Sequence, residues 1–111
     1  MNRLTIVVLL VLIRSTAYAV DGTGAELQQA CNHPKGTQEH RICAAYIGGV
    51  VDGMWASQKL LSIGRKSCVP RLADDDAIAV VLKYLRLRPD SLADHITSIV
   101  TASLAAEFDC K

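Results

Sequence analysis

Two cysteines and two histidines stand close enough together in the chain to suggest a metal site. They are spaced as Cys31-x-His33 and His40-x-x-Cys43, and a tetrahedral zinc site with two thiolates and two imidazoles takes its ligands from such a compact loop. The spacing matches no strong zinc pattern, however, whereas four cysteines in a short exported chain are typical of disulfides. We therefore predict no metal or other cofactor, and two disulfides formed by Cys31, Cys43, Cys68 and Cys110.

A catalytic dyad is the second kind of chemistry that the residues suggest. Asp94 directly precedes His95, but no serine or cysteine stands in a recognisable nucleophile motif. If all four cysteines are oxidised, no thiol is left to attack a substrate. We therefore predict that the protein is not an enzyme and has no catalytic residues, which also argues against a small secreted hydrolase.

An acidic run is the first candidate surface for a partner. Asp74, Asp75 and Asp76 open a predicted helix, where each acidic side chain complements the helix dipole by about 0.3–1 kcal/mol. This capping role is the ordinary explanation of the run. Contact with calcium or with a basic partner is the alternative.

A charged turn between the last two predicted helices is the second candidate surface. Arg86, Arg88 and Asp90 surround Pro89 in this turn. Such a turn is ordinarily a solvated loop, but proline stiffens this one and lowers the ordering cost of binding. We predict that these residues contact a partner protein.

Helical periodicity accounts for most of the chain. Apolar residues recur at spacings of three and four, and no segment alternates with period two for long enough to demand a strand. The predicted helices cover 25–31, 37 to about 61–64, 74–88, and a last helix that an S-x-x-D pattern starts at 91–94. The predicted fold class is all-α, a small bundle of about four helices.

Glycines in the long predicted helix demand an explanation. Gly48, Gly49 and Gly53 each cost the helix up to about 1 kcal/mol relative to alanine. We expect them to let another helix approach closely. Gly49 lies within the apolar face, so Gly49→Leu is expected to overpack a neighbouring helix or a second subunit.

The predicted helices constrain how the cysteines pair. Cys43 and Cys68 lie at opposite ends of the long helix, and roughly 20 helical residues span about 30 Å, far beyond the ~7 Å between bridged Cα atoms. If the last two helices are antiparallel, Cys110 returns towards Cys68. The favoured pairing is Cys31–Cys43 with Cys68–Cys110, and Cys31–Cys68 with Cys43–Cys110 stays open as the second choice.

The first nineteen residues have the layout of a cleavable export signal. A basic start precedes a ten-residue run from Leu4 to Ile13 that is apolar except for Thr5, and small residues in an A-x-A arrangement end at Ala19. A membrane-spanning helix needs roughly 20 apolar residues, so a retained anchor is the less favoured alternative. We expect residues 1–19 to be removed, residues 20–111 to form one domain in the periplasm, and no stable membrane insertion after cleavage.

Signal removal also changes the charge. Arg3 and Arg14 leave with it, so lysines plus arginines fall from 12 to 10 against 11 acidic residues, a formal charge of −1. No basic surplus remains to bind phosphates, and nucleic acid is not expected as a partner.

Four segments follow one another in a specific order. They are Cys43-Ala-Ala-Tyr46-Ile-Gly-Gly49-Val-Val-Asp52-Gly53, Cys68-Val-Pro70, Val80-Val-Leu-Lys-Tyr84-Leu-Arg-Leu-Arg-Pro89 and Ser103-Leu-Ala-Ala-Glu-Phe108-Asp-Cys110. Together they resemble the Rap/Tai family of type VI secretion amidase immunity proteins, over roughly residues 27–110.

The resemblance implies a fold and a function. It implies a small all-α, HdeA-like periplasmic protein, often a homodimer, which binds a cognate peptidoglycan amidase effector and occludes its active site. The alternative function is an HdeA-like acid-stress chaperone, which would unfold at low pH and expose apolar surface. An upstream gene for a small Cys-His amidase would favour the immunity function.

Export and oxidation predict the state of the mature protein. It should begin at Val20 and contain no free thiol, because the signal is cut after Ala19 and the periplasm oxidises cysteines. Intact mass spectrometry of periplasmic protein, alkylated without reductant, measures both. Two or more alkylated thiols would contradict the prediction.

Overall fold

The computed structural model of the chain describes residues 22–61 and 68–110. The predicted export signal and the 62–64 end of the long helix lie outside these residues. Within the described residues, no helix combines the length and the apolar character needed to cross a membrane.

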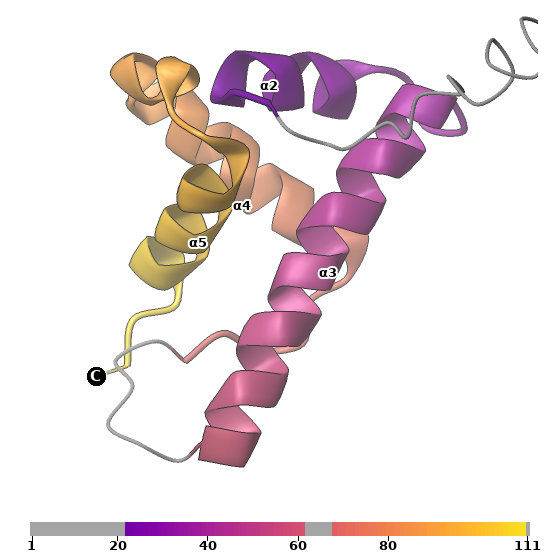
Figure 1. Ribbon diagram of the computed structural model, residues 1–111. Coiled ribbons are helices and arrows are strands. Elements are labelled where there is room, and N and C mark those ends of the chain that lie inside the picture. The colour runs from indigo at the N-terminus through magenta and orange to yellow at the C-terminus, as the bar shows by residue number, and fades with distance from the viewer. Residues whose placement is uncertain (1–21, 62–67, 111) are drawn as a thin grey trace, which may run out of the picture.

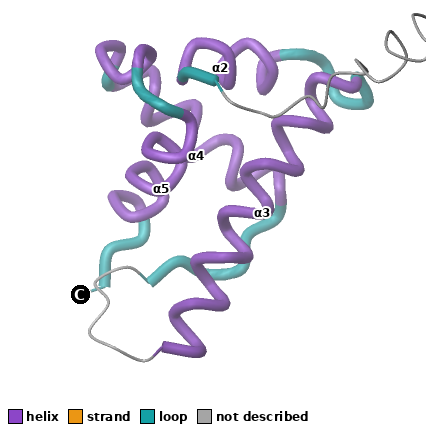
Figure 2. The backbone as a smooth tube through the Cα atoms, viewed as in Figure 1, coloured by secondary structure: helices purple, strands orange, loops and turns teal. Residues whose placement is uncertain are grey.

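Helices make up about three-quarters of the described chain, so the all-α prediction is confirmed. Four α-helices and one short 3-10 helix follow one another (Figure 1): α2 (Gly24–Asn32), α3 (Gln38–Leu61), α4 (Asp74–Leu87), η1 (Pro89–Ala93) and α5 (Ile96–Glu107). Figure 2 shows helices and loops, and no strand, in the described part of the chain.

Local sequence signals place several helix ends where we expect them. Thr37 is the N-cap of α3, because its Oγ1 accepts a hydrogen bond from the His40 amide at 3.3 Å. Arg88 ends α4 with φ −132° and ψ 72°, outside the helical region that a residue before proline avoids. Pro89 then occupies the first turn of η1, where its missing amide hydrogen costs nothing.

The start of α5 differs from the prediction. The expected S-x-x-D start at Ser91 and Asp94 is wrong, because Ser91 belongs to η1 and its Oγ donates to the Arg88 carbonyl at 2.6 Å. His95 is the N-cap instead, and its Nδ1 accepts from the Thr97 amide at 3.2 Å. The hydroxyl of Ser91, which the S-x-x-D pattern assigned to the start of α5, therefore forms its hydrogen bond within the separate 3-10 helix.

The core lies between α3, α4 and α5, with α2 across one end (Figure 1). Fully burying one aliphatic side chain contributes about 1.5–3 kcal/mol, so these residues supply most of the favourable free energy of folding. The largest completely buried ones are Ile47, Val51, Val69, Val81, Leu85, Ile96, Ile99, Val100 and Leu104. Those of α4 and α5 recur at spacings of three and four, the helical periodicity on which the all-α prediction depends.

Two disulfides have the favoured pairing. Cys31 and Cys43, with Cα atoms 5.2 Å apart, join the end of α2 to the start of α3. Cys68 and Cys110, with Cα atoms 5.0 Å apart, join the segment before α4 to the residues after α5. The Cys68 amide also donates to the Phe108 carbonyl at 2.9 Å, so a backbone hydrogen bond supports the second link.

A side-chain amide holds the segment before α4 against α3. Gln58 accepts from the Val69 amide at 2.8 Å and donates to the Val69 carbonyl at 3.1 Å. Val69 is buried beneath these bonds, and the Arg71 guanidinium lies 4.5 Å from the centroid of the Trp55 ring. These contacts determine where α4 begins.

The expectation that glycines of α3 admit another helix holds for Gly48, where a Cβ atom would lie 2.9 Å from Asp74 Oδ1 at the start of α4, and fails for Gly53. It is also wrong for Gly49 as regards contacts within the chain, and the most crowded helical glycine is Gly24 on α2. A Cβ atom on Gly49 would meet nothing within 4 Å, because the buried residues of α3 form a narrow stripe of Cys43, Ile47 and Val51 on another side. A Cβ atom on Gly24 would clash with Ile99 Cδ1. It would also lie 3.0 Å from the Ser91 carbonyl oxygen and 3.1 Å from Leu85 Cδ2.

Candidate partner-binding surface

The charged turn forms an exposed corner where α4 meets η1. We call Arg86, Leu87, Arg88, Pro89 and Asp90 the α4–η1 corner, and all five residues are exposed. In Figure 1 this corner lies at one end of the molecule, beyond the N-terminal end of α2. The structure thus brings together all four residues that we predict in the turn.

The corner is held from below by buried residues. Ser91 is only 6% exposed, and both its amide and its Oγ donate to the Arg88 carbonyl, at 3.0 and 2.6 Å. The Ser91 carbonyl in turn packs closely over Gly24 at the start of α2. An exposed turn with a buried anchor loses little conformational freedom on binding.

The Arg88 side chain is directed back along α4. Its guanidinium carbon lies 5.1 Å from the centroid of the Tyr84 ring, within the range of a cation–π contact. Stacking on the ring leaves the guanidinium N–H groups at its edge for a carboxylate. The contact therefore restrains Arg88 without using its hydrogen-bonding capacity.

Leu87 is an apolar member of the corner that sequence reasoning missed. The residue is 68% exposed. Among the described residues, two large hydrophobic side chains are exposed, and Leu87 is the more exposed of the two. A signal for it exists in the sequence, because the large apolar residues Ile78, Val81 and Leu85 recur at spacings of three and four, and they are buried in α4 together with Ala77. Leu87 breaks that spacing and must face away from the core.

A groove of about 210 Å³ lies between α4 and α5, directly beside the corner. Its lining comes from both helices. One wall consists of Val80, Lys83, Tyr84 and Leu87 of α4 with Arg88, the C-cap of α4, and the other consists of Ser103, Ala106 and Glu107 of α5. Lys83 Nζ donates to Glu107 Oε2 at 3.2 Å across the groove edge. The corner and the groove therefore form one continuous surface.

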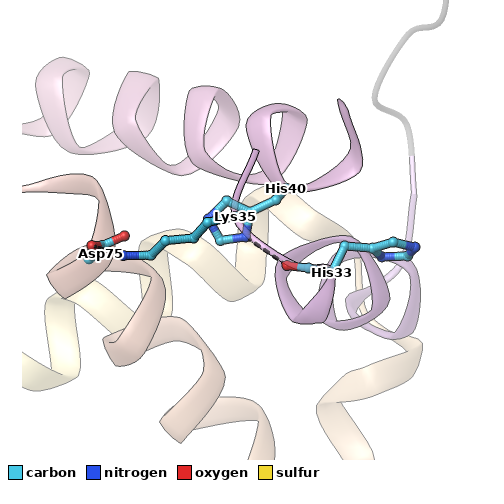
Figure 3. A network of polar contacts seen from close by, with 4 residues as sticks. All are labelled: His33, Lys35, His40 and Asp75. Atoms are coloured by element: carbon cyan, nitrogen blue, oxygen red, sulfur yellow. Dashed lines mark hydrogen bonds and ion pairs between the residues drawn. The ribbon is translucent and has the colours of Figure 1, made fainter. Parts of the chain in front are cut away.

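The acidic run lies at the other end of α4 and is partly used within the chain. Lys35 Nζ and Asp75 Oδ2 are 2.5 Å apart (Figure 3). The hydrogen bond and the charge of Lys35, with a smaller effect of His40, lower the pKa of Asp75. A 14-residue helix separates this run from the corner by about 20 Å, so the structure does not bring the two candidate surfaces together.

The histidines of the α2–α3 loop make hydrogen bonds to backbone carbonyls. His33 Nδ1 donates to the Gln29 carbonyl at 2.7 Å, and His40 Nδ1 donates to the His33 carbonyl at 3.0 Å (Figure 3). The two cysteines of the loop are joined to each other. Within residues 22–61 and 68–110, no three histidine, cysteine or acidic side chains are grouped to hold a metal ion.

Asp94 and His95, the candidate catalytic dyad, make contacts that hold the fold together. The His95 ring caps α5, and the Asp94 carbonyl accepts from the Gly24 amide at 2.9 Å. Both residues help to connect the start of α2 with the start of α5.

Comparison with known proteins identifies the family. No curated protein matches the chain in sequence. The model of a protein family described as Rap1a immunity proteins matches residues 23–110, which include every helix of the described fold. This agrees with the resemblance to the Rap/Tai immunity proteins and implies that the chain binds a cognate effector. The chain belongs to the Rap1a family of immunity proteins.

Proposed function

We propose that the protein acts in the periplasm, where it binds a type VI secreted peptidoglycan amidase and occludes its active-site cleft. Family membership supports immunity against a secreted effector, and the amidase is the effector class that the sequence motifs imply. The observation that supports occlusion best is the α4–η1 corner, which is exposed, charged and anchored by a buried serine.

The chemistry of the corner suits a concave enzyme site. Arg86, Arg88 and Asp90 present charges of both signs, able to pair with polar groups inside a cleft. Interface energy usually concentrates in a few residues, with arginine among the enriched types. A convex element with little freedom to lose is what such a cleft binds most tightly.

Replacing Arg86, Arg88 and Asp90 together by alanine should weaken binding to the amidase by at least about 2 kcal/mol, or about 30-fold in Kd. The fold should stay intact, since exposed loop charges contribute little to stability. Isothermal titration against the cognate amidase measures the affinity, and a thermal melt measures the fold.

A matched control removes the same charges from another surface. Arg41, Asp52 and Lys59 are exposed on α3, and their replacement by alanine should leave the affinity within about twofold because they lie outside the corner. Equal loss in both variants would indicate a long-range charge effect. Unchanged affinity in the corner variant would move the interface elsewhere, with Asp74, Asp75 and Asp76 as the next candidates.

Acid titration separates immunity from an acid-stress chaperone function. A chaperone of that kind would lose its far-UV helix signal at low pH and expose apolar surface. Failure of the wild type to bind any cell-wall amidase, together with such a loss, would favour the chaperone.

We also propose a homodimer, as the resemblance to the Rap/Tai family implies. Size-exclusion chromatography with light scattering measures the mass. A monomer at all concentrations tested would contradict this part of the proposal.

A further inference from the structure

We propose that the groove between α4 and α5 receives one apolar side chain of the effector, next to an effector carboxylate that Arg88 binds. This inference rests on the proposed function and specifies the chemistry of the partner at the same surface. The juxtaposition of Leu87, Tyr84 and Arg88 at the mouth of the groove carries it.

The volume of the groove selects the kind of occupant. Sites for cofactors and drug-sized ligands usually enclose about 300–1,000 Å³, and this groove holds about 210 Å³. An apolar cavity of about 150 Å³ accommodates a benzene ring. The groove therefore has room for one large side chain, and a whole small-molecule ligand would exceed it.

The walls of the groove favour an apolar occupant. Leu87 is 68% exposed beside it, and Val80 and Tyr84 are half-buried. A partner side chain seated there would remove Leu87 and one edge of the Tyr84 ring from water. Tyrosine is enriched among the few residues that supply most of the binding free energy of an interface. The wall that contains Tyr84 therefore has the composition of a binding site.

The charges around the groove favour an acidic neighbour for that side chain. Within residues 22–61 and 68–110, the ion pairs join Lys35 with Asp75 and Lys83 with Glu107. Glu107 is therefore neutralised at one edge of the groove, while Arg88 stays without an ion pair at the other. Arg88 is already oriented by the Tyr84 ring, and a carboxylate accepts two parallel hydrogen bonds from a guanidinium.

A charge placed at the mouth of the groove tests the inference. Leu87→Asp should raise the Kd for the cognate amidase at least tenfold, because the new carboxylate repels the effector carboxylate and removes part of the apolar wall. Ile42→Asp is the matched control. Ile42, on α3, is the other exposed large hydrophobic side chain of the described residues, at 38% exposure, and its replacement should change the Kd less than twofold.

Two further measurements identify the occupant. Arg88→Ala should flatten the salt dependence of the association rate, since it removes a charge that steers an acidic partner. A photo-crosslinking amino acid at position 87 should label an effector segment in which an apolar residue adjoins aspartate or glutamate. Labelling of a basic or wholly polar segment would overturn the inference.

Failure of the inference is distinguishable from failure of the proposed function. If the wild type binds the amidase and the triple alanine variant binds weakly, a Leu87→Asp variant that binds like the wild type overturns the groove alone. If the wild type does not bind the amidase at all, both fall. Leu87→Ser provides the same test without a new charge, should the aspartate variant fail to melt like the wild type.

Discussion

Replacing Cys68 and Cys110 together by alanine is expected to lower the free energy of unfolding by about 4 kcal/mol. The two cysteines are 42 residues apart in sequence, and a disulfide that closes a longer loop removes more conformational freedom from the unfolded chain. A small domain is typically stable by about 5–15 kcal/mol, so this loss would remove between about a quarter and four-fifths of the free energy of unfolding.

Urea denaturation of the oxidised wild type and of the variant measures this loss. Because Cys68 is exposed and Cys110 only half-buried, alanine at these positions leaves no large cavity, and the change reports mainly on the crosslink. A difference below about 1 kcal/mol would show that the backbone contact from Cys68 to Phe108 holds the two ends together without the disulfide.

Gly24→Ala is expected to destabilise the protein by about 1–3 kcal/mol, the usual cost of overpacking a core. The added methyl would press on Cδ1 of Ile99, which is 1% exposed, so this side chain would have to shift within the core. It would also crowd the Ser91 carbonyl and Leu85. Thermal melts of the variant and wild type measure the effect.

Gly49→Ala is the matched control for Gly24→Ala, and we expect the opposite sign. Nothing lies within 4 Å of the added methyl, and alanine favours a helix over glycine by up to about 1 kcal/mol. Equal destabilisation by both substitutions would show that crowding at Gly24 is not the cause. A Gly49 variant that keeps its stability but loses its oligomeric state would place a second subunit against α3.

Local patterns in the sequence were sufficient for most of the helices, and they favoured the cysteine pairing that the structure has. Thr37 and Pro89 act within one helical turn of their own positions, so their effects do not depend on the rest of the fold. The rise of a helix is constant, and this separates Cys43 from Cys68 whatever the packing. The family also followed from short motifs in a specific order.

Tertiary packing decided that Gly24 is crowded by other helices while Gly49 is not, and that Leu87 is exposed. Periodicity gives α3 a broad apolar face, but its neighbours bury only a narrow stripe that includes Ile47, and Gly49 is left in solvent. Gly24 is crowded by Leu85 and Ile99, which come from two other helices distant in sequence.

The binding surface likewise depends on contacts between distant residues. The turn around Pro89 was evident from its charges, but the groove beside it exists only because α5 packs along α4 and brings Ala106 opposite Tyr84. The anchor of the turn is also long-range, since the Ser91 carbonyl packs on Gly24. By itself the sequence determined the family and most of the helices and favoured the observed pairing of the cysteines, because local hydrogen bonding and spacing control them. The shape of the surface was decided by the tertiary structure, because the angle at which two helices pack is set by side chains far apart in the chain.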